Sequence, residues 1–451
     1  MKILVINGSP KCERSITLHS VYYLEKCFKE DEFEILHLIK EQKKYEEDFE
    51  ILKERIEGAD LLLFSYPVYK YQTPYYMHRF IEKLAESNTY TKGKYAAQIS
   101  TSAHFFDVTA QNFITENCND LGINMLHKLS AGMEDLLTEK GKKELLDFWN
   151  LIKFSMSKMP NVLMISKNKL EYPVSSNTYE QSIFDDNCKT ANDYIKTVLL
   201  TDYRDEDESL KNMILDFKQS YPHKVDEINL NDLEMKGGCL GCMQCATSGK
   251  CFYRDGFQET MEKTLLKADA VIYAFKIKNH SFGSRYKLFE DRLFFNGHRP
   301  PINGNTTAYL LSGSFEEEQN LKTIIHASND MYHCFVSGIV TDENISLTKY
   351  EIENLANKTA YSVENRISVP ETFYGMGGRL IFRDLVMKNR FIMKEDHEYY
   401  KSHNMYDYPN KIDMSMFLKS FGIFLMKHKN NGKNLQELMI LPYKKIIEYI
   451  S

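Results

Sequence analysis

Glycine and proline are scarce in this chain, and long apolar runs are absent. The 451 residues include 21 glycines and 11 prolines, far below the proportions of collagen-like or low-complexity sequences, which excludes a fibrous protein. Apolar runs such as LLLF at 61–64 and VLMI at 162–165 fall far short of the roughly 20 residues that a membrane-spanning helix needs. We therefore expect no membrane span.

Positive charge is not in excess either. Lys and Arg number 57 against 63 Asp and Glu, a net charge of −6, which gives no general attraction toward nucleic acid. The start MKILVINGSP has one lysine and an apolar run too short for a signal peptide. These features predict a cytoplasmic protein without a nucleic-acid partner.

The chain does contain enough apolar residues, 43%, for packed cores in two or three domains. In the first part, short apolar runs typical of buried parallel strands alternate with helical patterns. This alternation predicts an α/β fold, a doubly wound parallel sheet of five strands in the order 2-1-3-4-5. The expected strands are 2–7, 32–39, 61–67, 95–101 and 123–131, and the expected helices include 47–60, 75–86, 107–121 and 137–158.

The same pattern occurs twice. ADLLLFSYP at 59–67 aligns without a gap on ADAVIYAFK at 268–276, and the offset of 209 holds for RFIEKL at 79–84 against LFEDRL at 288–293. The second copy would have its strands at 196–202, 224–230, 268–276, 306–314 and 333–340. Between its second and third strands it carries about 15 extra residues, which include a cysteine-rich insertion at 237–251.

We accordingly expect two tandem domains, 1–160 and 196–368, joined by a linker at 161–195 and followed by a basic, mainly helical tail at 369–451. Residues 379–451 hold 13 Lys and Arg against 8 Asp and Glu, which invites an anionic partner. The amphipathic stretch 379–394 could lie on a membrane surface or contact a phosphate, or it could pack on its own domain.

Two loops of the first copy follow expected strands and should meet at one edge of its sheet, where α/β proteins bind ligands. NGSPKCERSIT at 7–17 leads into a helix N-terminus, which can bind a phosphate through N–H groups and hydroxyls. Its candidate ligands are Ser9, Lys11, Ser15 and Thr17. YPVYKYQ at 66–72 offers Pro67 and Val68 as a fixed backbone and Tyr69 and Tyr71 as flat surfaces for an aromatic ring.

Together these loops resemble those of the NAD(P)H-dependent FMN reductases, which have a flavodoxin-like fold. The family's first loop reads like GSPR, its third-strand loop like PVYWGS, and its next helix contains K-x-F-x-D-R. This chain has Gly8-Ser9-Pro10-Lys11 and Pro67-Val68-Tyr69, and its second copy has Lys287, Phe289, Asp291 and Arg292. The tail, with FYGMGG at 373–378, looks like those of tandem bacterial oxidoreductases of this kind.

The resemblance implies FMN in the first domain, with its phosphate on the first loop and its ring on the third-strand loop. Thr101 and Ser102 are further candidate contacts in the fourth-strand loop, where STSAHFF at 100–106 replaces the family's usual glycine-rich sequence. NAD(P)H would be the co-substrate. Because the cofactor performs the chemistry, no side chain is named as an acid or base.

The second copy differs at both loops. TDYRDEDES at 201–209 has five acidic residues and one arginine, which would repel a phosphate, and Lys276 aligns with Pro67. An FMN site there would need a different phosphate clamp.

A run of four cysteines is the sharpest motif: Cys239, Cys242, Cys245 and Cys251. Compact thiolate runs can wrap an iron-sulfur cube, because short consecutive turns aim several sulfurs inward. Four soft ligands would also suit zinc, although zinc sites usually present two separated pairs, and free thiols or disulfides are the third alternative. The spacing resembles that of the iron-sulfur flavoproteins, which implies a 4Fe-4S cluster.

These features predict an NAD(P)H-dependent FMN oxidoreductase, from which electrons could pass through a cysteine-bound cluster to a small-molecule or protein acceptor. The alternative is a non-enzymatic electron carrier or interaction protein with zinc or free thiols in the second domain. Related proteins pair so that two cofactor crevices face each other. We therefore expect either a homodimer or an intramolecular pseudo-dimer that brings residues 239–251 toward Tyr69 and Tyr71.

Overall fold

The computed structural model describes residues 1–158, 194–300, 302, 304–367, 372–406 and 435–449. Most of the expected linker, 161–195, lies outside the described residues. The chain forms two compact units. The first comprises Met1–Lys167, Gly238–Gly249 and Ile381–Ser451, and the second comprises Asn168–Gly237 and Lys250–Leu380. No described helix is long and apolar enough to cross a membrane.

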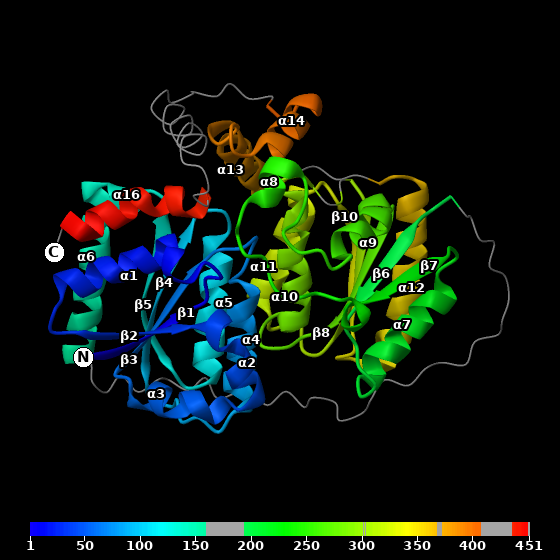
Figure 1. The fold of residues 1–451 in the computed structure, drawn as a ribbon. Coiled ribbons are helices and arrows are strands. Elements are labelled where there is room, and N and C mark those ends of the chain that lie inside the picture. Colours follow the sequence, from blue (N-terminus) through cyan, green and yellow to red (C-terminus); the bar gives the residue numbers. More distant parts are fainter. Residues whose placement is uncertain (159–193, 301, 303, 368–371, 407–434, 450–451) are drawn as a thin grey trace. The chain divides into compact units, whose positions relative to one another are not determined.

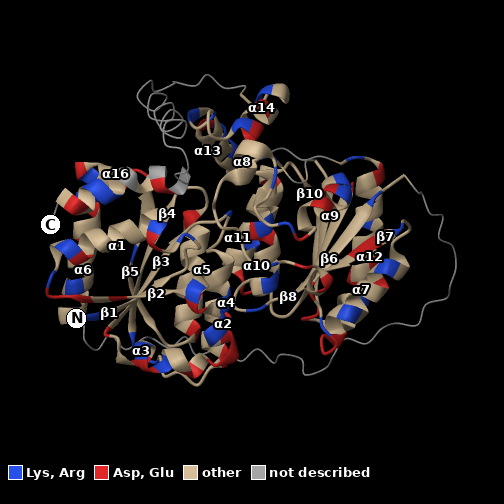
Figure 2. Ribbon diagram, viewed as in Figure 1, with Lys and Arg blue, Asp and Glu red and all other residues tan. Residues whose placement is uncertain are grey.

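The first unit contains a five-stranded parallel sheet in the order β2-β1-β3-β4-β5. This is the predicted 2-1-3-4-5 order of a flavodoxin-like fold. Figure 2 shows β3 and β4 free of charged residues, as expected for strands buried on both faces. The strands are β1 (Lys2–Asn7), β2 (Glu32–His37), β3 (Leu61–Pro67), β4 (Tyr95–Ser102) and β5 (Asn124–Gly132).

Helices cover both faces of this sheet (Figure 1). Alternate residues of β1 point to opposite faces. Leu4 and Ile6 pack in one apolar core with α4 and α5, whereas Ile3 and Val5 pack in the other with α1 and α6. The helices are α1 (Ile16–Cys27), α2 (Leu38–Glu47), α3 (Lys53–Gly58), α4 (Tyr75–Glu86), α5 (Asp107–Asp120) and α6 (Glu139–Lys158).

The helix expected over 47–60 consists of a 3-10 turn at Phe49–Leu52 followed by α3, and the helix α2 that precedes it was not predicted. Asp48 separates α2 from the 3-10 turn, because its backbone is extended (φ −147°, ψ 108°) and its side chain accepts a hydrogen bond from the Glu50 N–H. Such a cap begins a new helix rather than continuing the old one.

The second unit repeats the first. Its sheet has the order β10-β9-β8-β6-β7, which is again 2-1-3-4-5, and β8 lies 209 residues after β3, as the sequence alignment predicts. The strands are β6 (Thr197–Thr201), β7 (Val225–Asn229), β8 (Ala270–Lys276), β9 (Thr306–Ser312) and β10 (Phe335–Thr341). The helices are α7 (Glu208–Ser220), α9 (Phe257–Lys263), α10 (Gly283–Arg292), α11 (Gln319–Met331) and α12 (Ile345–Glu364).

Two further segments complete the first unit. Residues 238–249 contain the short helix α8 (Gln244–Ser248), and the tail contains α14 (Lys394–Ser402), α16 (Leu435–Tyr449) and the last part of α13 (Phe373–Lys388). Ala246 packs in a small apolar core with Val386, Met393 and Tyr400. The apolar side of the 379–394 stretch is therefore used inside the protein.

Candidate functional site

The first loop connects β1 to α1 and is tied to β3. The Gly8 N–H donates to the Ser65 carbonyl at 2.9 Å. A Cβ at Gly8 would lie 2.8 Å from Met77 Cε and 3.1 Å from Met77 Cβ, so glycine lets this loop pack closely on α4. The loop therefore begins at the carboxyl end of two central strands.

Buried hydroxyls follow in this loop. Ser9 and Ser15 are almost fully buried, and each hydroxyl oxygen accepts a backbone hydrogen bond: Ser9 from the Lys11 N–H at 3.3 Å and Ser15 from the Leu18 N–H at 3.4 Å. Accepting these bonds leaves the hydroxyl hydrogens to donate elsewhere. Thr17, in the first turn of α1, is also buried. The loop thus combines hydroxyl donors with a helix N-terminus, a combination suited to an anion.

The third-strand loop is a tight turn after β3. Tyr69 and Gln72 exchange two backbone hydrogen bonds, of 2.8 and 3.2 Å, and Lys70 between them has φ +55°. The Val68 N–H donates to the Thr101 carbonyl at 3.0 Å, which joins this loop to the end of β4. Pro67, Val68 and Tyr69 are half-buried.

Tyr71 does not offer an open ring surface. Its side chain is 1% exposed, and its ring packs against Phe105 and Phe106, with centroids 5.3 and 4.9 Å away. The sequence analysis expected both Tyr69 and Tyr71 to offer flat surfaces to an aromatic ring, but the structure buries Tyr71 in the core. Tyr69 is half-buried.

Buried hydroxyls without partners mark the same sheet edge. The Oγ atoms of Ser65, Thr73 and Thr101 are buried and make no hydrogen bond with any described residue. Ser102, next to Thr101, accepts from the His104 N–H at 2.8 Å. Burying a hydroxyl without a hydrogen bond is unfavourable, so these three groups fit a site that a polar ligand completes.

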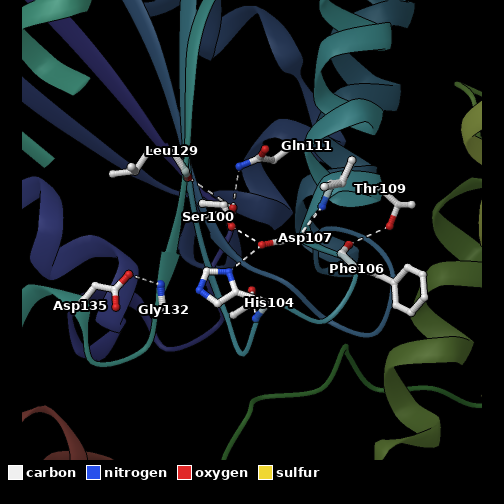
Figure 3. A network of polar contacts seen from close by, with 12 residues as sticks. Ser100, His104, Phe106, Asp107, Thr109, Gln111, Leu129, Gly132 and Asp135 are labelled. Carbon is white, nitrogen blue, oxygen red and sulfur yellow. Dashed lines mark hydrogen bonds and ion pairs between the residues drawn. The ribbon is translucent and has the colours of Figure 1, made fainter. Parts of the chain in front are cut away.

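Beyond Ser102, a histidine in the loop before α5 meets a carboxylate in the first turn of α5 (Figure 3). His104 Nδ1 is 3.0 Å from Asp107 Oδ2, and the Ser130 hydroxyl on β5 donates to the same oxygen. Burial alone would raise the pKa of Asp107, but the hydrogen bonds from Ser130 and His104 lower it. Sequence reasoning missed this group. The signal that could have found it is the i, i+3 spacing of His and Asp at a helix start.

The cysteine segment 238–249 contacts both flavin-type loops within the first unit. A Cβ on Gly241 would lie 2.4 Å from the Tyr69 hydroxyl oxygen and 2.7 Å from Lys11 Cε. Burial lowers the pKa of Lys11, and the neighbouring Cys239 and Cys242 partly offset this effect. The structure therefore brings together Lys11, Tyr69 and two of the four cysteines.

The cysteines themselves are half-buried and not paired in disulfides. Left-handed backbone at Gly241 (φ +59°) and Met243 (φ +60°) produces the short turns of the run. Cys251 belongs to the second unit, where its N–H donates to Gln258 Oε1 at 2.9 Å.

In the second unit, polar groups at the corresponding edge of the sheet bind one another. Lys276, which aligns with Pro67, lies 3.2 Å from Asp207 in the acidic loop. Asp342 accepts from the hydroxyls of Ser209 and Ser312 and from the Gly313 N–H, at 2.6 to 2.8 Å. In the second unit, an ion pair and a carboxylate therefore occupy the edge of the sheet at which the first unit has hydroxyls available for a ligand.

Comparison with known proteins gives a family match in the first unit. Residues 1–113 match the family model of NADPH-dependent FMN reductase. An iron-sulfur flavoprotein from Archaeoglobus fulgidus is 25% identical over 189 residues, covering 40% of this chain and 83% of that protein. Over residues 1–113, the family model therefore agrees with the family that the two loops resemble.

Two solved structures are also similar. An FMN-dependent NADH-azoreductase from Bacillus anthracis gives a TM-score of 0.28 at 15% identity and covers 36% of this chain and 100% of that one. An NAD(P)H:quinone oxidoreductase from Methanothermobacter marburgensis gives a TM-score of 0.27 at 15% identity and covers 33% of this chain and 91% of that one. The fold assignment rests on the strand order of the two sheets.

Proposed function

We propose that this protein is an NAD(P)H-dependent oxidoreductase that binds FMN in its first domain and a 4Fe-4S cluster on its four clustered cysteines. The observation that carries the proposal is the meeting of Gly241, inside the cysteine run, with Lys11 and Tyr69. One of these residues comes from each loop expected to hold FMN. When bound, FMN accepts a hydride from NAD(P)H and the cluster carries single electrons.

The residues for FMN are those of the sheet edge in the first unit. Ser9, Ser15 and Thr17 would bind the phosphate through their hydroxyls and the start of α1. Pro67, Val68 and Tyr69 would line the ring, and Thr101 and Ser102 would contact its polar edge. The unpartnered Thr101 hydroxyl supports this assignment. Tyr71 would act through packing, since Phe105 and Phe106 cover its ring.

Cys239, Cys242, Cys245 and Cys251 would be the cluster ligands. The single compact run of four cysteines supports a cube, which carries one thiolate on each of its iron corners, because zinc sites usually present two separated pairs. Lys11 would lie beside two of the ligands, Cys239 and Cys242. Electrons would then leave the first domain for a small-molecule or protein acceptor.

An absorption spectrum of anaerobically purified protein, followed by steady-state assays with NADH and NADPH, tests the proposal. We expect flavin and iron-sulfur bands that dithionite bleaches, and sustained oxidation of a nicotinamide cofactor. A spectrum without flavin would reject the enzyme. Flavin without turnover would favour an electron carrier instead.

The variant Ser9→Asp tests the phosphate site. Ser9 is 1% exposed, so a carboxylate there would repel the phosphate and remove a hydroxyl donor. We expect FMN to bind at least about 10²-fold more weakly, or about 2.7 kcal/mol, as measured by flavin fluorescence titration. Ser157→Asp, at an exposed serine near the end of α6, is the matched control. Equal FMN affinity in both variants would move the phosphate elsewhere.

The variant Cys242→Ser tests the cluster. If all four cysteines hold one cluster, loss of one ligand should remove most of the iron, because an incomplete cluster falls apart. Independent thiols would instead respond additively to single and double substitutions. Iron and zinc are measured in the anaerobic protein, with Cys118→Ser as the control, since Cys118 is buried in the first core. A wild-type protein with neither metal would contradict the assignment.

A further inference from the structure

The tail packs on the cysteine segment 238–249. Residues 381–406, which we call the strap, belong with this segment to the first unit, and α8 and α14 lie side by side (Figure 1). Ala246 on α8 is 4% exposed. It lies in an apolar core with three residues of the strap, Val386, Met393 and Tyr400. The Thr247 hydroxyl donates to the Ile392 carbonyl of the strap at 3.0 Å. Apolar packing and a hydrogen bond therefore join α8 to the strap.

The strap is also fixed to two loops at the carboxyl edge of the sheet. The Phe382 ring stacks on the Phe105 ring in the loop after β4, with the centroids 4.1 Å apart. Lys388 lies 3.4 Å from Glu134 in the loop after β5. These two contacts do not involve the cysteine segment, so the strap has its own attachment to the rest of the first unit.

The cysteine segment therefore depends on two sets of contacts. Gly241 meets Lys11 and Tyr69 of the loops assigned to FMN, whereas α8, which contains Cys245, meets the strap. The helix α8 has only five residues, and a helix this short is unstable by itself. The conformation of this part of the cysteine run is therefore maintained by tertiary packing, which the strap provides.

We propose that the strap shields the thiols of the cysteine segment from reagents in solution, with Tyr400 and Thr247 as positioning residues for the metal ligands. The inference rests on the proposed function for the identity of the metal, but the shielding of the thiols is a property of the chain itself. The cysteines are half-buried, so a chelator or a thiol reagent gains full access when the segment separates from the strap. Such local opening costs less free energy than unfolding of the whole unit.

Labelling of the full-length, iron-free protein with N-ethylmaleimide under anaerobic conditions tests the inference. Tyr400 is 2% exposed, so Tyr400→Ala would leave a cavity between the strap and α8. We expect Cys242 and Cys245 to react at least about 10-fold faster in this variant than in the wild type, because local opening becomes more frequent. Mass spectrometry of the labelled peptides gives the rate for each cysteine.

Two references separate a loosened strap from a destabilised protein. Tyr443→Ala removes another buried tyrosine of the tail, which belongs to the core of α1 and α6 and not to the core of Ala246. In this variant, labelling of Cys242 should stay within about twofold of wild type. Cys118 is fully buried in a core of the first unit, and its labelling reports general unfolding. It should not rise with that of Cys242 in Tyr400→Ala.

Thr247→Val is a milder variant, which keeps the folded packing. Valine has nearly the shape of threonine, so the substitution removes only the hydrogen bond to Ile392. We expect labelling of Cys245 to rise about threefold, as for the loss of one neutral hydrogen bond.

Metal retention gives a second readout. In protein purified anaerobically with its iron, loss of iron to bipyridyl should be at least about 10-fold faster in Tyr400→Ala than in wild type, and unchanged in Tyr443→Ala. A wild-type protein without iron would reject the cluster of the proposed function, and the labelling rates would still decide the role of the strap. Equal labelling of Cys242 and Cys245 in wild type, Tyr400→Ala and Thr247→Val would overturn the inference, as would a parallel rise at Cys118.

Discussion

Arg292 and Asp255 form a buried ion pair beside the cysteine run. Both side chains are 1% exposed, and the guanidinium makes two contacts of 2.8 Å with the carboxylate. Burial would raise the pKa of Asp255, but Arg292 and the Lys236 N–H lower it to about 2. The pair therefore fixes Lys236 and Asp255, which stand just before and just after the cysteine run.

The variant Asp255→Asn should lower the free energy of unfolding by about 3–5 kcal/mol at pH 7, because it leaves a buried arginine uncompensated. The carboxylate has a lower pKa when folded, so its stabilisation is present above about pH 4 and disappears as the pH falls toward 2. The difference between variant and wild type in urea titrations should shrink over that range. Asp205→Asn, at a fully exposed carboxylate paired with Lys211, should leave the stability almost unchanged.

The strands could be predicted well and the helices less so. β3 and β8 are continuous apolar runs buried on both faces, and this pattern is unmistakable in a sequence. The helix α2 (LIKEQKKYEE) was not predicted. Its buried residues are Leu38 and Tyr45, so its sequence has too few apolar positions for a helical period to stand out.

The tail is an integral element of the first unit. Tyr443 on α16 is 4% exposed and belongs to the core formed by α1 and α6. Its ring centroid lies 6.3 Å from that of His19, whose pKa is lowered by burial. The C-terminal helix thus covers a face of α1 that lies beside the first loop.

Tyr443→Ala should destabilise the first unit by about 3–4 kcal/mol, because it removes a buried ring and leaves a cavity. Tyr449→Ala, at a residue of the same helix that is 93% exposed, should have almost no effect. Thermal unfolding followed by circular dichroism measures both. Similar melting temperatures for the two variants would mean that α16 does not stabilise the unit.

At the scale of the whole molecule, the organisation of the candidate site was only partly predictable. The loops with Ser9 and Tyr69 follow strands whose order can be inferred, so their proximity could be expected. The contact of Gly241 with Lys11 joins residues 230 positions apart, and no periodic pattern encodes such a contact. The predicted domain boundaries assigned the cysteine run to the second copy, whereas residues 238–249 pack in the first unit.

Gly241→Val tests how closely residues 238–249 pack against Tyr69 and Lys11. A side chain there would collide with Tyr69 and Lys11, so the segment should shift and Cys239 and Cys242 should react at least about 10-fold faster with a thiol reagent. Gly249→Ala is the matched control, because Gly249 has a similar left-handed backbone (φ +68°) but only ordinary contacts, at 3.7 Å. Equal labelling rates in both variants would attribute the effect to backbone strain alone.

The order in which the units are completed during synthesis follows from their division along the chain. The second unit ends at Leu380, whereas the first also needs Gly238–Gly249 and Ile381–Ser451. Domains generally fold as their residues emerge from the ribosome. The unit whose sheet is made first is therefore finished after the second unit, and the face of α1 that receives Tyr443 waits uncovered until residues 435–449 have been made.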